Sequence, residues 1–366
     1  MAARKRSSID SVCIPDDCPD SESDFSFDSD SDINFSDCSS SSDESDHDSI
    51  NLQSVRQWCK IDMRNIPPPP PPVPFRGNSG ITVNIANNAS ILNYFELFFV
   101  DQILRMIVQE TNRYAEKYIH KTVCKERSRR KKWTETNVEE LRLFFAILLL
   151  QGVIKKPEQE HYWSKRQTLS TPIFAKVIGR NRFLLLMKFL HFTNNEEFDK
   201  DRHPWPKLNK IYELMEHLQR KFREVYIPGE NLSLDESLMK FKGRLKWKMY
   251  IAKKRARFGL KFFVLCEAEC RYISDFLIYT GEGTVYNPKY SQYPVSTQIV
   301  LHLMDRFLGK GYCVTIDNFY MSPQLADIFV TEKMDTYGTV NKPEKTSLSI
   351  FKRESLQGGN CCLSKR

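Results

Sequence analysis

The sequence lacks the features of membrane and secreted proteins. Its longest unbroken apolar run has eight residues, Leu143 to Leu150, whereas a membrane-spanning helix needs roughly 20. The N-terminus has no apolar core of a secretory signal. The ten cysteines are scattered without repeated close spacing, which is typical of reduced thiols rather than of a disulfide framework. We therefore expect a cytosolic or nuclear protein with no membrane partner.

Motifs of several common sites are missing as well. The sequence contains no Walker loop, no dinucleotide-binding glycine fingerprint and no nucleophile elbow. Cys266 and Cys270 have no His or Cys pair at zinc-ligand spacing near them, and Cys361 and Cys362 fit no zinc pattern. We expect no zinc site in this chain and interpret Cys266 and Cys270 as core residues.

Acidic residues are concentrated at the start of the chain. Residues 1–50 hold 14 acidic and 3 basic residues, net −11, so residues 51–366 hold 32 acidic and 51 basic residues, net +19. A region this basic commonly binds a polyanion, and nucleic acid is the leading candidate because phosphate contacts dominate such binding. An acidic substrate remains an alternative.

The segment from Ser7 to Ile50 is rich in Ser, Asp and Glu and contains no Lys or Arg. Such a composition cannot bury enough apolar surface to offset the entropy of ordering. We expect residues 1–60 to be a disordered acidic tail that solubilises the protein, is phosphorylated by an acid-directed kinase, or binds basic proteins. Six consecutive prolines, Pro67 to Pro72, predict a stiff linker over residues 61–87.

Apolar residues at spacings of three and four predict helices over residues 88–228, with packing that begins near Asn88. The predicted helices are Ile91–Lys117, Thr136–Gln151, Pro172–Ile178, Arg182–Phe192 and Leu208–Tyr226. Thr136 and Glu139 have the pattern of a capping box at the start of the second helix.

The pattern changes to strands after Pro228 and Gly229. The predicted strands are Leu232–Asp235, Phe262–Cys266, Tyr272–Tyr279 and Tyr312–Ile316. We expect one helix from Ser296 to Leu308, stopped by Gly309, and another opened by Ser322 and Pro323. The order over residues 229–345 is strand, hairpin strands, helix, strand, helix, strand, which predicts an α/β fold.

Two carboxylates hold equivalent positions, because Asp235 and Asp317 each end a short apolar strand. If those strands are neighbours, both side chains project at the same end and share a divalent cation. Metal-dependent phosphoryl-transfer sites are built in this way. The alternative is that each aspartate is an ordinary turn or cap residue.

Basic residues dominate the chain just after Asp235. Between Ser237 and Cys266 there are ten basic residues and no acidic one. Alternation with apolar residues over 240–249 predicts an extended segment with cations on one face. We interpret the following residues as contacts to a DNA backbone: Lys240, Lys242, Arg244, Lys246, Lys248, Lys253, Lys254, Arg255 and Arg257.

A second basic run extends from Lys125 to Lys132. Its residues fit a nuclear localisation signal, a DNA-backbone contact or a solvated loop between helices, and the sequence does not decide between them. The candidate residues are Arg127, Arg129, Arg130, Lys131 and Lys132.

Several ordered motifs resemble the piggyBac transposases and the proteins derived from them. The run LDESLMKFKGR at 234–244, with RFGLK at 257–261, is similar to the region of the family's first catalytic aspartate, and TIDNFY at 315–320, with SP at 322–323, is similar to that of the second. Upstream matches are YFELFF at 94–99, ETN at 110–112, WT at 133–134, YW at 162–163, RF at 182–183 and LHF at 190–192. The match covers about residues 88–345, and its wording is nearest to that of the type 4 derived proteins.

The resemblance implies an α/β fold: an RNase H-like mixed-sheet core of the DDE superfamily, preceded by a mainly α-helical domain and the disordered acidic tail. That core binds Mg²⁺ or Mn²⁺ through three aspartates and excises DNA at TTAA sequences. Asp235 and Asp317 match the first two aspartates. The resemblance also implies a helical region at 88–228 for dimerisation and DNA binding, a homodimer, and a nuclear location.

The chain departs from the family pattern after Gly338. The family continues through an insertion to a third aspartate and a zinc module, whereas here residues 346–366 match only the start of that insertion. The core at 229–345 is therefore expected to be incomplete, catalytically impaired and open on one sheet face, with apolar surface exposed there. The main hypothesis is a nuclear DNA-binding protein. The alternatives are an active transposase or nuclease with Glu236, Asp305 or a partner's carboxylate as third ligand, and an interaction protein that works through its tail.

Overall fold

The computed structural model describes residues 64–65, 71, 73–121, 128–250 and 258–339. The chain divides into two units, Met1–Trp58 and Cys59–Arg366, and all described residues belong to the second. The predicted tail at 1–60, most of the proline run and residues 346–366 lie outside the described residues. Every helix within these ranges is too short or too polar to cross a bilayer.

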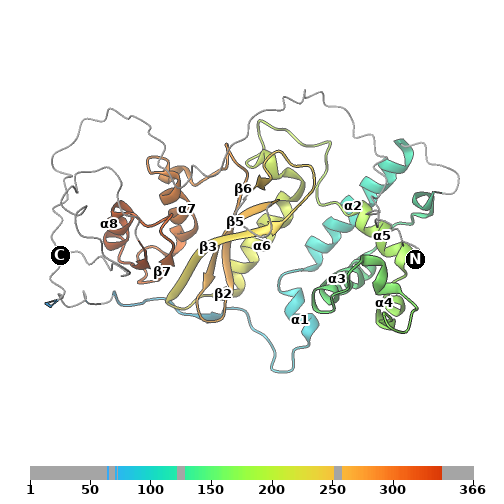
Figure 1. Cartoon of the computed structure of the whole chain (residues 1–366), viewed down its shortest axis with the longest axis horizontal. Coiled ribbons are helices and arrows are strands. Elements are labelled where there is room, and N and C mark those ends of the chain that lie inside the picture. Colours follow the sequence, from blue (N-terminus) through green and yellow to red (C-terminus); the bar gives the residue numbers. More distant parts are fainter. Residues whose placement is uncertain (1–63, 66–70, 72, 122–127, 251–257, 340–366) are drawn as a thin grey trace, which may run out of the picture. The chain divides into compact units, whose positions relative to one another are not determined.

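Helices make up the region between Ile91 and Val225, as predicted (Figure 1). They are α1 (Ile91–Glu96), α2 (Asp101–Lys121), η3 (Arg129–Lys132), α3 (Val138–Val153), η4 (Gln159–Trp163), α4 (Pro172–Val177), α5 (Arg180–Phe189), η5 (Pro206–Ile211) and α6 (Tyr212–Val225). Their largest buried cluster includes Leu104, Ile107, Phe144, Ile147 and Phe183. These side chains come from α2, α3 and α5, so apolar burial holds the helices together.

Several helix boundaries in this region differ from the prediction. The helix expected over Leu208–Tyr226 is a 3-10 helix, η5, followed by α6, and α5 ends at Phe189 instead of Phe192. The helix expected over Ile91–Lys117 is interrupted, because α1 ends at Glu96 and α2 begins at Asp101. Phe98 contacts Phe222 while Phe99 packs on Phe145, and these different partners turn the chain between the two helices. The N-cap of α3 is Asn137, one residue later than the predicted Thr136, and its side chain accepts the amide of Glu140.

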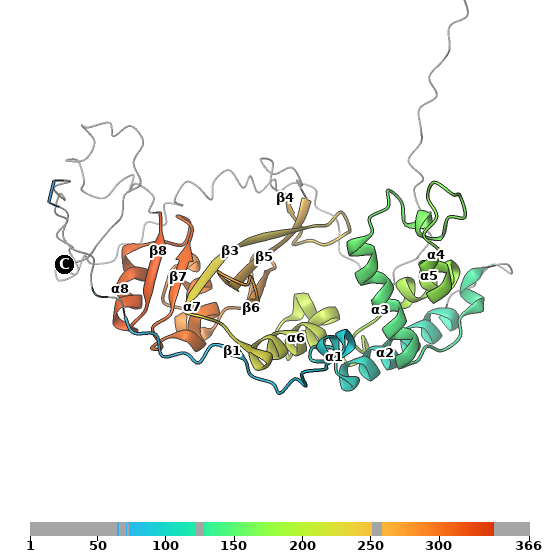
Figure 2. The same cartoon turned by 90° about the horizontal axis from the view of Figure 1, so that it is seen from below.

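A mixed sheet forms the region after Val225, in the predicted order of strands and helices. Its elements are β3 (Asn231–Lys240), β4 (Met249–Tyr250), β5 (Phe258–Glu267), β6 (Ile273–Tyr279), η6 (Pro288–Tyr290), α7 (Val295–Met304), η7 (Asp305–Phe307), β7 (Cys313–Ile316), α8 (Pro323–Thr331) and β8 (Asp335–Gly338). The strand order is β4-β5-β3-β7-β8, with β6 also paired to β5. Strand β3 is antiparallel to β5 and parallel to β7, and β8 is the edge strand beyond β7 (Figure 2).

One face of this sheet carries the main apolar core. Leu232 and Leu234 of β3 join Phe263 of β5, Val300 of α7 and Phe329 of α8, all nearly inaccessible to solvent. Helix α7 starts at Val295 after Pro294, so Ser296 is not its cap as predicted. The other predicted cap, Ser322 of α8, accepts the amide of Leu325.

Packing starts earlier in the chain than the expected Asn88. The ring of Phe75 meets the ring of Tyr312 edge to face at 4.9 Å, and the amide of Arg76 donates to the carbonyl of Lys310. Strand β1 (Gly80–Ile81) pairs with β2 (Tyr226–Ile227). The later part of the predicted linker therefore binds the sheet region instead of acting only as a spacer.

Candidate functional site

The register of the sheet brings Asp235 and Asp317 next to each other. The last paired residues of β3 and β7 are Leu234 and Ile316, and each aspartate is the following residue of its chain. The two strands are parallel neighbours, which lie roughly 4.8 Å apart. The structure therefore juxtaposes the two carboxylates, which the sequence predicted for the case that their strands are neighbours. Asp317 follows the last residue of β7, whereas Asp235 does not end its strand as predicted, because β3 pairs with β5 as far as Lys240.

Both aspartates lie on the face of the sheet opposite the apolar core. Successive residues of a strand point to opposite faces, so Asp235 shares its face with Ser233, whereas Leu234 points into the core. The paired positions on β7 behave in the same way, because Thr315 and Asp317 are exposed and Ile316 is buried. This surface around Ser233, Asp235, Thr315 and Asp317, which we call the open face, is polar at these four positions. Tyr337 of β8, paired with Thr315, adds an aromatic ring to it.

Each aspartate uses one carboxylate oxygen to fix its own backbone. Oδ1 of Asp235 accepts the amide of Glu236 at 2.7 Å, and Oδ1 of Asp317 accepts the amide of Asn318 at 2.6 Å. The carbonyl of Asp317 accepts the amides of Tyr320 and Met321, which closes a tight turn directly after β7. Both side chains are exposed to solvent and available to a ligand.

Glu236 is an unsuitable third ligand for a cation shared by the two aspartates. It points to the core face, where its Oε1 lies 2.7 Å from Nζ of the buried Lys261. The hydroxyl of Tyr320 also donates to Oε1 of Glu236. Burial, followed by the nearby carboxylate of Glu236, raises the pKa of Tyr320, so this phenol stays protonated. The expectation that Glu236 substitutes for a third carboxylate is therefore not supported by the geometry.

Asp305 is also engaged elsewhere. It follows α7, and its Oδ1 lies 3.1 Å from Nζ of Lys289 and accepts the hydroxyl of Tyr290. Hydrogen bonding by Tyr290 lowers the pKa of Asp305. This carboxylate therefore belongs to a local network with η6.

The carboxylates of Asp235 and Asp317 are the kind of ligand that a hard divalent cation prefers. Carboxylate oxygens are the ligands that Mg²⁺ and Mn²⁺ prefer, and such ions often take only one or two protein carboxylates and complete their shell with water or phosphate. Among the residues that the structure describes, no group of three or more His, Cys, Asp or Glu side chains is placed to hold a metal ion. The donor set thus fits two ligands of a cation site.

The basic segment after Asp235 is not one extended strand. Strand β3 ends at Lys240, and residues 241–248 form a bent loop. The cations are exposed as predicted as far as Lys246: Lys240, Lys242, Arg244 and Lys246 are exposed, whereas the half-buried Trp247 packs against the cluster of Leu208, Met215 and Ile278. Lys248 is half-buried, with Nζ 5.1 Å from the ring centroid of Phe258. Lys253, Lys254, Arg255 and Arg257 lie outside the described residues.

The second basic run begins with a folded turn in its described part. Arg129–Lys132 form η3, and Arg127 lies outside the described residues. Arg130 donates to the hydroxyl of Tyr118 at 2.6 Å, while Lys131 and Lys132 are exposed. At least one of its cations is therefore built into the helical packing.

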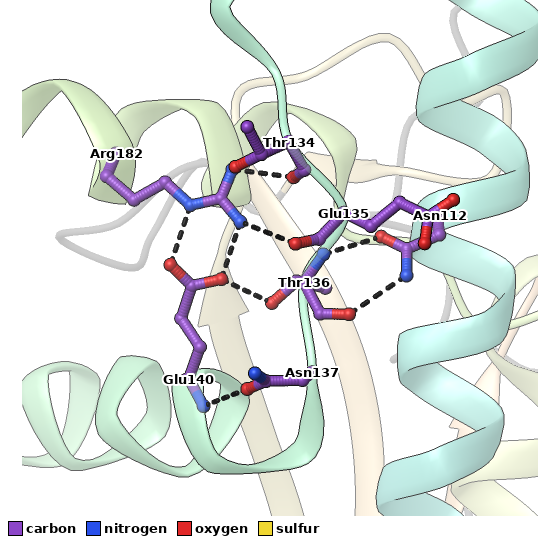
Figure 3. Close-up of polar contacts among 7 residues, drawn as sticks. All are labelled: Asn112, Thr134, Glu135, Thr136, Asn137, Glu140 and Arg182. Carbon is purple, nitrogen blue, oxygen red and sulfur yellow. Dashed lines mark hydrogen bonds and ion pairs between the residues drawn. The ribbon is translucent and has the colours of Figure 1, made fainter.

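A polar network fixes the start of α3 to its neighbours (Figure 3). Arg182 of α5 donates from Nε to Glu140 at 2.6 Å and from Nη1 to the carbonyl of Thr134 at 2.9 Å, and its guanidinium lies 4.6 Å from the ring centroid of Trp133. The amide side chain of Asn112 exchanges two hydrogen bonds with the backbone of Thr136. From the sequence, Asn112, Thr134 and Arg182 were noted only within motif matches and Thr136 only as a predicted helix cap, while Glu140 was missed. The network joins residues of α2, α3 and α5, which are far apart in the sequence, so no local sequence pattern predicts these contacts.

Cys270 differs from its predicted place in the core. It is exposed, and its Sγ donates to the carboxylate of Glu267. Cys266 is half-buried, and burial raises the pKa of its thiol.

Comparison with known proteins assigns the family. The family model described as Transposase IS4 matches residues 91–358. A solved structure titled as a piggyBac transposase synaptic complex with hairpin DNA aligns with a TM-score of 0.66 and 26% identity, over 77% of this chain and 57% of that chain. The chain belongs to the piggyBac transposase family. This finding confirms the predicted resemblance and the predicted mixed α/β fold class.

Two human piggyBac relatives show how much of a longer protein the match represents. PiggyBac transposable element-derived protein 3 is 28% identical over 271 residues, which cover 71% of this chain and 42% of that protein. PiggyBac transposable element-derived protein 2 is 24% identical over 322 residues, which cover 83% and 50%. The chain thus spans about half the length of these relatives. The expected likeness to the type 4 proteins stays a prediction.

Proposed function

We propose that this piggyBac family chain binds double-stranded DNA, with Asp235 and Asp317 presented to the DNA as two ligands of a divalent cation. The observation that carries the proposal is the juxtaposition of these aspartates on an exposed, polar sheet face. A relative of known structure was solved with hairpin DNA, which supports DNA as the polyanion for the basic region.

The basic loop supplies the electrostatic part of the proposed interface. Lys240 follows Asp235 by five residues of the same strand, which corresponds to about 16 Å. Its side chain leaves the other face of β3 by the same alternation and is exposed at the end of the strand, where the chain turns into the loop. Lys242 and Arg244 continue the exposed cations beyond the strand. Phosphate contacts of this kind position a duplex without reading its sequence.

The residues of the open face hold and orient the proposed site. The amide bonds to Glu236 and Asn318 fix one oxygen of each aspartate, so the second oxygen of each is left for a cation or a water. A bound Mg²⁺ or Mn²⁺ supplies neutralisation of phosphate charge and activation of water. Glu236 and Asp305 are each paired with a lysine, so neither is placed to complete the shell of a cation held by the two aspartates. A nuclear location follows from the proposed DNA partner.

The test of DNA binding is fluorescence anisotropy on a labelled duplex over a series of salt concentrations. We expect affinity to fall steeply as salt rises, and replacement of Lys240 and Lys242 by Gln to reduce the salt slope by about two. The matched control replaces the exposed Lys310 and Lys333 by Gln, which removes the same charge. Affinity that is insensitive to salt, or equal losses in both variants, would overturn the proposal.

The second candidate function is metal-dependent cleavage of DNA, which the paired aspartates favour. A nicking assay on a duplex that contains TTAA, with and without Mn²⁺, tests it directly. Cleavage that requires Mn²⁺ and is lost in both Asp235→Asn and Asp317→Asn establishes this function. Bound but uncut duplex supports the binding function alone.

A further inference from the structure

Lys261 is a charged residue in an unusual position. It lies on β5 with 5% of its surface exposed, and its ammonium is 2.7 Å from Oε1 of Glu236. Aromatic rings surround the same ammonium, with Nζ 4.8 Å from the ring centroid of Phe263 and 5.4 Å from that of Phe319. A buried lysine is costly unless it is paired, so the position calls for an explanation.

The contacts of Lys261 reach both strands that carry the site aspartates. Glu236 directly follows Asp235 on β3, while Phe319 and Tyr320 belong to the turn that the carbonyl of Asp317 closes. Tyr320 is 1% exposed and donates to the same Glu236 oxygen that Lys261 binds. One ion pair on the core face therefore connects the backbone beside one aspartate to the turn beside the other.

We propose that Lys261 is a positioning residue for the cation site, acting through Glu236 and the Phe319–Tyr320 turn to fix the separation of Asp235 and Asp317. This inference rests on the proposed function, because it needs the two aspartates to share a cation. Lys261 itself lies on the opposite face of the sheet and does not touch the ligand. Outer residues that orient metal ligands commonly change metal affinity when replaced.

The test compares Mn²⁺ binding, read from the free-ion electron paramagnetic resonance signal, in four forms of the full chain. The double variant Lys261→Met with Glu236→Met removes the ion pair without leaving a buried charge alone, so it is the variant expected to fold. We expect its Mn²⁺ affinity to fall about tenfold. Lys261→Arg keeps the charge, so we expect it to retain most of the wild-type affinity, and we expect Asp235→Asn to lose most of it.

Hydrogen exchange gives a second measurement that does not depend on metal. The amides of Tyr320 and Met321 donate to Asp317, so we expect them to exchange at least about tenfold faster in the double variant once the turn is released. Unchanged exchange at these amides overturns the inference. If the double variant binds Mn²⁺ as the wild type does and Asp235→Asn loses affinity, the inference about Lys261 is overturned and the proposed cation site stands. Unchanged affinity in Asp235→Asn overturns the site and the inference together.

Discussion

The side chains on the two faces of strand β3 differ in burial and in chemical character. On one face, Leu232 and Leu234 are fully buried against α7, α8 and β5, and Glu236 is held by a buried lysine. On the other face, Ser233 and Asp235 lie beside exposed residues of β7. Because side chains alternate along a strand, the buried residues of β3 stabilise the fold while their direct neighbours are free to form the proposed cation site.

The largest expected effect tests the covered face. Leu234→Ala removes a side chain that is 1% exposed, and we expect the free energy of unfolding to fall by about 2–5 kcal/mol through lost burial and a cavity. Ser233→Ala, on the open face, should change it by less than about 0.5 kcal/mol. Urea unfolding followed by circular dichroism measures both, and equal effects would remove the distinction between the faces.

A smaller effect is expected in the helical region, where the polar network of Arg182 contributes to stability in addition to apolar burial. Arg182→Met breaks the bonds to Glu140 and the backbone of Thr134, so we expect the free energy of unfolding to fall by about 1–3 kcal/mol. Arg180→Met is the control, because the ion pair of Arg180 with Glu160 is more exposed and worth about 1 kcal/mol or less. Urea unfolding that shows the control as the costlier variant would contradict the assigned role.

The same network predicts a pH dependence. The hydrogen bonds from Arg182 hold the pKa of Glu140 below its ordinary value in the folded protein. Glu140 therefore stabilises the fold at neutral pH, and this contribution is lost as pH falls from the ordinary pKa of about 4.3 through the lower folded value. Glu140→Gln should be less stable than the wild type at pH 7 and approach it at low pH. Glu139→Gln, the exposed neighbour, serves as the control in urea unfolding at each pH, and a gap that widens toward acid would contradict the prediction.

The smallest expected effect concerns the open face itself. Asp235 is exposed and its carboxylate bonds only locally to the next amide among the contacts described above, so Asp235→Asn should shift the free energy of unfolding by less than about 0.5 kcal/mol. Thermal unfolding measured by calorimetry checks this. A loss as large as that of Leu234→Ala would place Asp235 in the stabilising part of the strand.

Local patterns in the sequence predicted the sheet but not its interior polar contacts. Alternation is visible within a few residues, so the order of strands and helices along the chain could be predicted. Asp235 was expected to end its strand but lies inside β3, which continues to Lys240, and its place beside Asp317 depends on which strands pair. The break between α1 and α2 depends on Phe98 and Phe99 packing against distant rings. The burial of Lys261 likewise depends on a partner 25 positions earlier and on a turn 58 positions later, and no local pattern records such contacts.

The most direct test of the account is a double-mutant cycle on Mn²⁺ affinity with Asp235→Asn, Asp317→Asn and both together. If the two carboxylates share one cation, each single variant should lose most of the affinity and the double variant should lose little more, because neighbours in one site are not additive. Independent, additive losses, or single variants that bind Mn²⁺ as the wild type does, would contradict a shared site on the open face.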